Sequence, residues 1–200
     1  MLAEGRTHWG RAAWLFVPSV FALGGITVGI AEGALAASFG VSGQAFKVSA
    51  SSVEGTDVAA YLDTVQSVDG ANHPVMLAGV KEASLTDVCT SAVVDIPVVG
   101  NVSLKVLGGK QEPITGTNVV ADAEALLSAG GVVKNVEAGR DASTLNRVPG
   151  VQGPAGRFGL QAGSLSTDAV QSTAWSANGG TLTLSGDLEV SVTAGVHECF

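Results

Sequence analysis

Residues 181–194 read TLTLSGDLEVSVTA, and this stretch decides the fold that the sequence predicts. Every second residue from Leu182 to Ala194 is apolar or glycine, and the residues between them are polar or charged. A period of two places alternate side chains on opposite faces of a β-strand, whereas an amphipathic helix needs a period of 3.6. The stretch therefore predicts half-buried strands.

The same alternation recurs in other parts of the chain, at residues 46–50 and 102–107. Asn178-Gly179-Gly180 is typical of a hairpin turn, so we expect residues 173–176 and 181–185 to pair as antiparallel strands. Taken together, these patterns predict a mainly β fold for residues 38–200. We expect an antiparallel β-sandwich or β-roll, with a short β-solenoid as the alternative.

Helical signals after residue 38 are few. Residues 118–128 have apolar residues at helical spacing and are followed by two glycines, which predicts a short helix there. Residues 57–68 fit either a short helix or a strand. Residues 140–156 are rich in Gly and Pro, and we predict a flexible loop.

The N-terminal segment predicts where the protein resides. Residues 1–11 form a short basic tail with Arg6 and Arg11, and residues 12–31 carry no charge. We predict that residues 12–33 form a retained transmembrane helix, with the N-terminus inside and residues 38–200 outside the cell. The alternative is a signal peptide that is cleaved near Ala36 and releases a secreted protein.

Three glycines inside this segment predict self-association. Gly25, Gly29 and Gly33 are spaced four residues apart, so they share one face of a helix. A face of glycines lets a second helix approach closely in lipid. We therefore expect a homo-oligomer that assembles through these three residues.

The charge balance narrows the class of partner. The chain has a formal net charge of −8, and only 14% of its residues are charged. Phosphate backbones need a basic surface, so we exclude nucleic acid as a partner. We expect other copies of the chain and membrane lipid as partners, with another envelope membrane protein as a further candidate.

The two cysteines, Cys89 and Cys199, both follow the predicted membrane segment. An even number of cysteines in an oxidising compartment predicts a disulfide between them. The bond would tie the last residue but one to the body of the domain.

No catalytic motif stands out along the chain. A hydrolase of the α/β class should show G-x-S-x-G, and that pentapeptide does not occur. His73 and His197 are the candidate bases of the exported part, and each also fits an exposed histidine without a catalytic role. Trp175 and Phe200 are candidate ligand contacts or core aromatics. We predict no catalytic residue, no metal site and no cofactor.

Several stretches resemble one protein family. They are residues 33–39, residues 41–50, residues 100–104 and the ending Glu198-Cys199-Phe200. They resemble exported proteins of Streptomyces and related actinobacteria, along nearly the whole chain. The resemblance implies a location in the actinobacterial cell envelope. Many members carry the label cholesterol esterase, but no catalytic residue carries over because the nucleophile motif is missing.

Three functions are consistent with these features. The first is a non-enzymatic, membrane-anchored envelope protein that self-assembles through its glycine-lined helix. The second is a lipid-binding or lipid-carrying envelope module that uses the apolar inside of the β domain. The third, least favoured, is a lipid esterase with a non-standard site.

Overall fold

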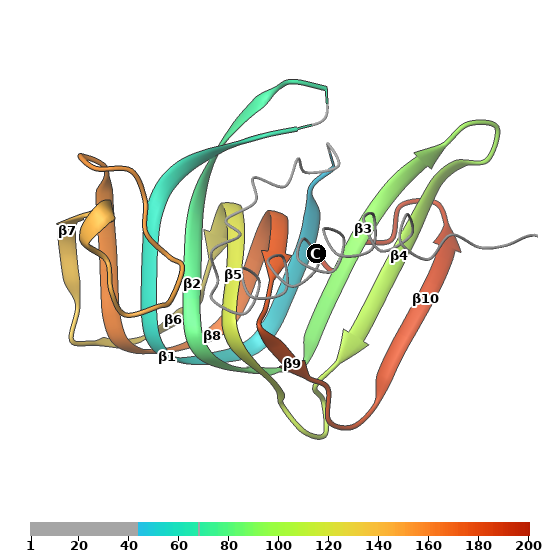
Figure 1. Ribbon diagram of the computed structural model, residues 1–200. Coiled ribbons are helices and arrows are strands. Elements are labelled where there is room, and N and C mark those ends of the chain that lie inside the picture. The colour runs from blue at the N-terminus through green and yellow to red at the C-terminus, as the bar shows by residue number, and fades with distance from the viewer. Residues whose placement is uncertain (1–43, 68) are drawn as a thin grey trace, which may run out of the picture. The chain divides into compact units, whose positions relative to one another are not determined.

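The computed structural model describes residues 44–67 and 69–200 (Figure 1). The chain divides into two units, Met1–Ser38 and Phe39–Phe200, and the described residues belong to the second. The predicted helix over residues 12–33, with Gly25, Gly29 and Gly33, lies outside the described residues. Among those that are described, no helix has the length and apolar character needed to cross a membrane.

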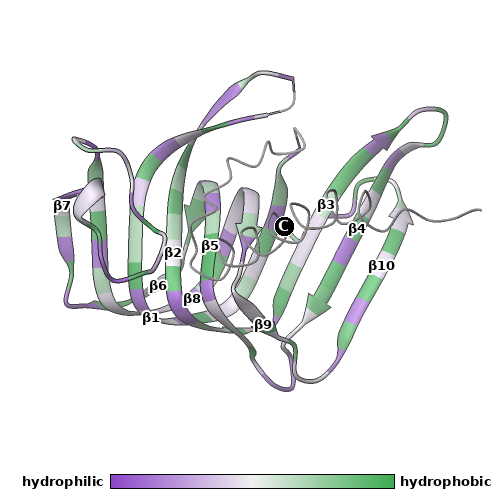
Figure 2. Ribbon diagram, viewed as in Figure 1, coloured by the Kyte–Doolittle hydropathy of each residue, from purple (hydrophilic) through white to green (hydrophobic). Residues whose placement is uncertain are grey.

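The described residues form ten strands and one short 3-10 helix, η1. Their bounds are β1 Phe46–Gln66, β2 Asn72–Thr86, β3 Val88–Ile96, β4 Gly100–Gly108, β5 Ile114–Leu127, β6 Gly130–Lys134, β7 Glu137–Asp141, η1 Ala142–Thr144, β8 Phe158–Asn178, β9 Thr181–Thr183 and β10 Leu188–Ala194. Hydrophobic and hydrophilic residues alternate along many of these strands (Figure 2). The mainly β fold that this alternation predicts is confirmed.

All ten strands belong to one antiparallel sheet. Its main order is β10-β4-β3-β1-β2-β5-β8-β6, with β7 added to β8 and β9 added to β5. The strand β1 pairs with both β2 and β8, and β5 pairs with the same two strands. These four strands therefore form a closed circuit of hydrogen-bonded neighbours. Residues of β1, β2 and β5 contribute to the hydrophobic core cluster.

Two predictions made from local sequence are wrong. Residues 118–128 lie mostly in β5 and not in a helix, because β5 finds pairing partners on both sides, in β2 and β8. The predicted hairpin is absent as well: β9 pairs with β5 instead of β8. Gly180 N–H donates to Thr117 O at 2.9 Å, and this bond directs the chain after the Gly-Gly turn towards β5. Residues 57–66 belong to β1.

The long strands bend sharply, as β1 and β2 show in Figure 1. Asp57 in β1 and Asn118 in β5 have left-handed backbone conformations, with φ of 50° and 48°. The pairing registers place both residues at the level of Lys81 in β2, so the bends line up across three strands. Asp and Asn tolerate this conformation better than other residues with a side chain.

Glycine is required beside this bend. A Cβ atom on Gly55 would lie 2.7 Å from Val80 Cγ1, and one on Gly116 would lie 2.6 Å from Val119 Cγ2. Both distances are too short for a real contact, so only glycine at these two positions leaves room for the side chains of Val80 and Val119. The sequence uses small residues here to fold the sheet tightly.

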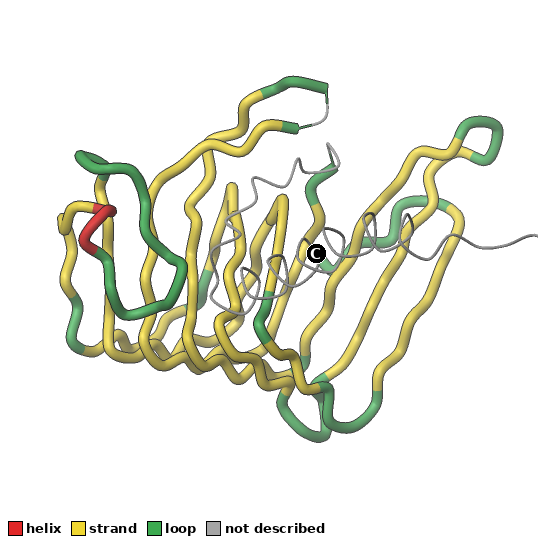
Figure 3. The backbone as a smooth tube through the Cα atoms, viewed as in Figure 1, coloured by secondary structure: helices red, strands yellow, loops and turns green. Residues whose placement is uncertain are grey.

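The segment between β7 and β8 supplies three almost completely buried aliphatic side chains. Leu145 and Val151 are fully buried, and Val148 is 2% exposed. They pack with Ala59 and Tyr61 of β1, and a Cβ on Gly79 of β2 would collide with Val151. This segment, predicted above to be a flexible loop, is irregular apart from η1 (Figure 3) and forms the core cluster.

Candidate apolar binding surface

The strands β3, β4 and β10 present one apolar face to the surroundings. In the pairing register, Ala92 lies opposite Leu104 and Leu104 opposite Val192. The neighbouring rows are Val94, Val102 and Ala194 on one side and Thr90, Val106 and Val190 on the other, so the face is apolar except for Thr90. Val192 is 69% exposed and Val190 57% exposed, so the described residues leave this apolar face uncovered.

The C-terminal tail, residues 195–200, covers part of the opposite face, over β3 and β4. Ser103 and Ser91 point to this side and are each 1% exposed. Ser103 Oγ donates to Gly195 O and accepts from His197 N–H, both at 2.8 Å. Ser91 Oγ accepts from Cys199 N–H at 3.0 Å. The two buried hydroxyls therefore satisfy the backbone of the tail.

A disulfide joins this tail to β3. Cys199 is bonded to Cys89, as the sequence predicts, with the two Cα atoms 5.9 Å apart. Lys47 Nζ adds an ion pair to Glu198 at 2.9 Å and lies 5.1 Å from the centre of the Phe200 ring. Phe200 and His197, which the sequence offered as a ligand contact and a base, thus belong to the tail, where both are exposed.

A groove of about 330 Å³ crosses the apolar face near β1. Its lining residues are Gln44, Phe46, Thr90, Ala92, Val94, Leu104, Val106 and Trp175. Two aromatic side chains, from β1 and β8, border an aliphatic surface made by β3 and β4. Sites for small apolar molecules are typically concave and lined in this way.

Trp175 is fixed in place by two contacts. Its Nε1–H donates to Glu124 Oε2 at 3.2 Å, and its ring stacks on His73 with centroids 3.9 Å apart. Of the two aromatic candidates from the sequence, Trp175 is the one that the structure places at a groove. It has a preset orientation there, which lowers the entropy lost on binding a ligand.

His73, the other candidate base, contacts a serine. Its Nε2 lies 3.2 Å from Ser67 Oγ, and Ser67 Oγ also donates to Asp69 Oδ1. This hydrogen bond lowers the pKa of Asp69, and the backbone N–H of Ala71 lowers it further. Ser67 is 4% exposed, so a substrate carbonyl has no access to its oxygen. The cluster closes the turn between β1 and β2.

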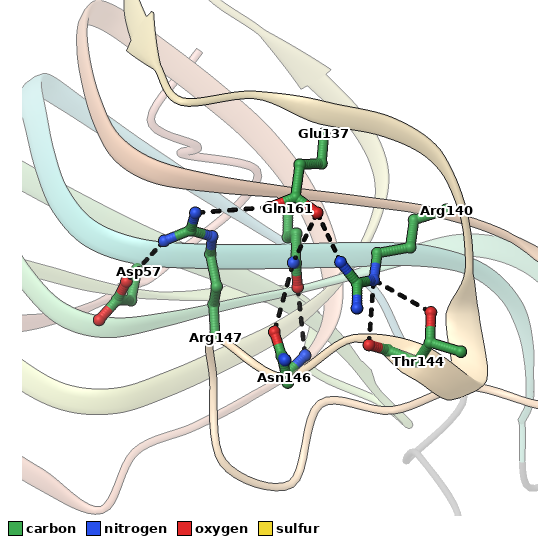
Figure 4. Close-up of polar contacts among 7 residues, drawn as sticks. All are labelled: Asp57, Glu137, Arg140, Thr144, Asn146, Arg147 and Gln161. Carbon is green, nitrogen blue, oxygen red and sulfur yellow. Dashed lines mark hydrogen bonds and ion pairs between the residues drawn. The ribbon is translucent and has the colours of Figure 1, made fainter.

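A second polar cluster anchors the segment between β7 and β8 (Figure 4). Arg147 bridges two carboxylates, with Nη1 3.3 Å from Asp57 Oδ1 and Nη2 3.5 Å from Glu137 Oε1. Glu137 also accepts from Arg140 and from Gln161, and these two hydrogen bonds lower its pKa. These ion pairs and hydrogen bonds join the segment to β1, β7 and β8, although Arg147 Nε is buried and has no hydrogen-bond partner among the described residues.

Sequence reasoning missed the groove because exposure is a property of the folded chain. The alternation of β4 and β10 predicted which residues share a face, but it assigned the apolar face to the core. One signal was available in the sequence. Only a short tail follows residue 194, and a tail of that length cannot cover both faces of three strands, so one face had to stay exposed.

The comparisons with known proteins give one match. Residues 42–200 match the model of a family described as "Family of unknown function (DUF6230)". No curated protein and no solved structure matches the chain.

Proposed function

We propose that this chain, which belongs to the DUF6230 family of unknown function, is a non-enzymatic cell-envelope module that holds a lipid acyl chain on its apolar face. The single observation that carries the proposal is the uncovered apolar face of β3, β4 and β10 with its aromatic-bordered groove. Contiguous exposed apolar surface on a folded domain marks sites for proteins, membranes or apolar ligands. The volume of the groove lies at the lower end of the usual range for small-molecule sites.

The start of the described chain supports lipid as the ligand. Gln44 lines the groove, so the domain connects at this point to the N-terminal part of the chain. In our proposal residues 12–33 stay in the membrane as a single-pass anchor, and residues 34–43 link the anchor to Gln44.

The remaining parts of the proposal come from the sequence. We place the protein in the actinobacterial cell envelope, and we propose that Gly25, Gly29 and Gly33 gather copies of the chain in the membrane. For the fold we propose the rolled form of the sheet, because the closed circuit of β1, β2, β5 and β8 supports it. The esterase alternative finds no support in the buried Ser67.

Photo-crosslinking tests the lipid site. The full chain is reconstituted in phosphatidylcholine vesicles that contain a lipid with a diazirine in its acyl chain, and cross-linked peptides are mapped by mass spectrometry. We expect cross-links in β4 and β10, near Leu104 and Val192, in addition to those in the N-terminal anchor. Cross-links confined to residues 12–33 would refute the proposal.

Two neighbouring residues of β10 provide a matched pair of variants. Val192→Asp places a charge on the apolar face, and we expect it to reduce the β4 and β10 cross-links several-fold. Thr193→Asp places the same charge on the other face of the same strand, where it should leave the cross-links unchanged. Equal yields from both variants would show that the apolar face does not hold the acyl chain.

A further inference from the structure

A second surface, with no residue in common with the apolar groove, crosses six strands of the sheet. It is an open groove of about 770 Å³, more than twice the volume of the apolar one. Its lining is ordered in two rows that run across the strands β6, β8, β1, β2, β5 and β9. The first row, in that strand order, is Lys134, Ser164, Thr56, Glu82, Thr117 and Thr181.

The second row lies two residues away along each strand. In the same strand order it is Val132, Ser166, Glu54, Ser84, Thr115 and Thr183. Members of each row are direct partners in the pairing register, so all their side chains lie on one face. Neighbouring strands are about 4.8 Å apart and the two rows about 7 Å, so the array is about 24 Å long.

Hydroxyl groups dominate this array. Eight of its twelve side chains are Ser or Thr, and each hydroxyl can donate and accept a hydrogen bond. Among the described residues, the hydrogen bond recorded within the array runs from Thr56 Oγ1 to Glu82 Oε2 at 3.2 Å. The other hydroxyls face solvent and are available to a ligand. Glu54 and Glu82 add acceptors, and Lys134 adds a donor.

Exposed strands favour Thr, so a few hydroxyls on a sheet need no ligand. The alignment is what goes beyond that expectation: five strands from distant parts of the chain, β8, β1, β2, β5 and β9, bring their Ser and Thr residues into two rows, which Glu54 and Glu82 interrupt. The neighbouring face of β3, β4 and β10 belongs to the same sheet and has an apolar composition instead. Ser and Thr thus dominate the lining of one groove, and apolar residues dominate the lining of the other.

The chemistry of the groove excludes several ligands. A peptide cannot add as a strand over the middle of the groove, because the four inner strands already pair on both sides. Glu54 and Glu82 repel a polyanion such as nucleic acid. An acyl chain would desolvate the hydroxyls without replacing their hydrogen bonds. The ligand therefore has to be extended and rich in groups that both donate and accept.

We propose that this groove binds an extended glycan strand, neutral or carrying amino sugars, that lies across the six strands. Sugar hydroxyls follow one another along a glycan, as the Ser and Thr hydroxyls do along the two rows. The two carboxylates accept from sugar hydroxyl or amino groups, and Lys134 donates at one end. The proposal does not depend on lipid binding, because the two surfaces are separate.

Co-sedimentation with insoluble glycans tests the site. The full chain in mild detergent is mixed with chitin or with microcrystalline cellulose, and the bound fraction is measured after centrifugation. We expect saturable binding to at least one of the two. A chain that stays in the supernatant with both glycans at every concentration would overturn the proposal.

Isosteric variants locate the binding. Thr117→Val and Thr181→Val each remove one hydroxyl of the first row at nearly constant shape, and each should weaken binding about five-fold. Thr193→Val, on β10 and outside the groove, is the matched control and should bind as the unaltered chain does. Circular dichroism checks that all three variants are folded. Unchanged binding by both groove variants would overturn the assignment to this surface.

Discussion

Cys199 donates its backbone N–H to the hydroxyl of Ser91, 3.0 Å away, and Ser91 stands two residues from the cysteine to which Cys199 is bonded. The tail is therefore attached to β3 both covalently and through a buried hydroxyl. This double attachment keeps one face of β3 and β4 closed and leaves the apolar face as the open one.

Breaking the disulfide should weaken the domain. Cys89 and Cys199 are separated by 110 residues. A cross-link that closes a loop of that length lowers the entropy of the unfolded chain, which stabilises the folded state by about 4–5 kcal/mol in the chain-entropy description. Native hydrogen bonds retain part of the tail, so we expect Cys199→Ser to lower the free energy of unfolding by about 2–4 kcal/mol. Urea unfolding followed by circular dichroism measures the change. An unaltered midpoint would contradict the structural role of the bond.

Truncating Leu145 should leave a cavity in the core cluster. Leu145 is fully buried between the segment after β7 and the strand β1, so Leu145→Ala should cost about 2–5 kcal/mol of folding free energy. Leu184→Ala is the control, since Leu184 is 48% exposed, and it should change stability by about 0.5 kcal/mol or less. Similar losses for the two variants, measured by urea unfolding, would contradict the core assignment.

The bend in β5 makes a prediction about Asn118. Its φ of 48° is accessible to glycine without strain and is unfavourable for a β-branched residue. We expect Asn118→Gly to keep the stability within about 1 kcal/mol, and Asn118→Val to lose about 1–2 kcal/mol. Thermal unfolding of the two variants gives the comparison. If valine is tolerated as well as glycine, β5 does not bend at this residue.

Asp141 predicts how stability depends on pH. Its carboxylate accepts from Gly156 N–H, Ser143 N–H and the Ser143 hydroxyl, and these bonds lower its pKa below the ordinary value near 3.8. A pKa lower in the folded than in the unfolded state gives stability that is present above the unfolded value and is lost as the pH falls through the folded one.

We therefore expect the melting temperature of the unaltered chain to fall as the pH drops from about 5 to about 2, and Asp141→Asn to flatten part of that fall. Asp95→Asn, at the exposed end of β3, controls for the loss of one negative charge. A flat profile for the unaltered chain, or the same slope in Asp141→Asn as in the unaltered chain, would refute the role of Asp141.

Sequence reasoning found the element types better than their partners. The alternation in residues 181–194 correctly predicted strands, because side-chain period is a local property. It could not predict that β9 pairs with β5, since that choice depends on Thr117, which lies more than sixty residues earlier in the chain. The helix predicted for residues 118–128 failed for the same reason: pairing on both sides of β5 overrides a weak local preference.

The sites divide in the same way. The bond between Cys89 and Cys199 was predictable from the number of cysteines and the expected compartment. The burial of residues 140–156 was not, because Gly and Pro signal irregular backbone but say nothing about packing. The two rows of hydroxyls were invisible as well, since Thr56, Thr117 and Thr181 become neighbours only through the strand order.

The pairing of β1 with β8 sets how early the domain can complete its folding during synthesis. A ribosome releases β1 more than ninety residues before the start of β8, and the cysteine partner of Cys89 comes last but one. One edge of β1 therefore stays unpaired until β8 has been made. An unpaired edge of this length is prone to pair with other chains, so delayed folding would protect the incomplete chain from aggregation.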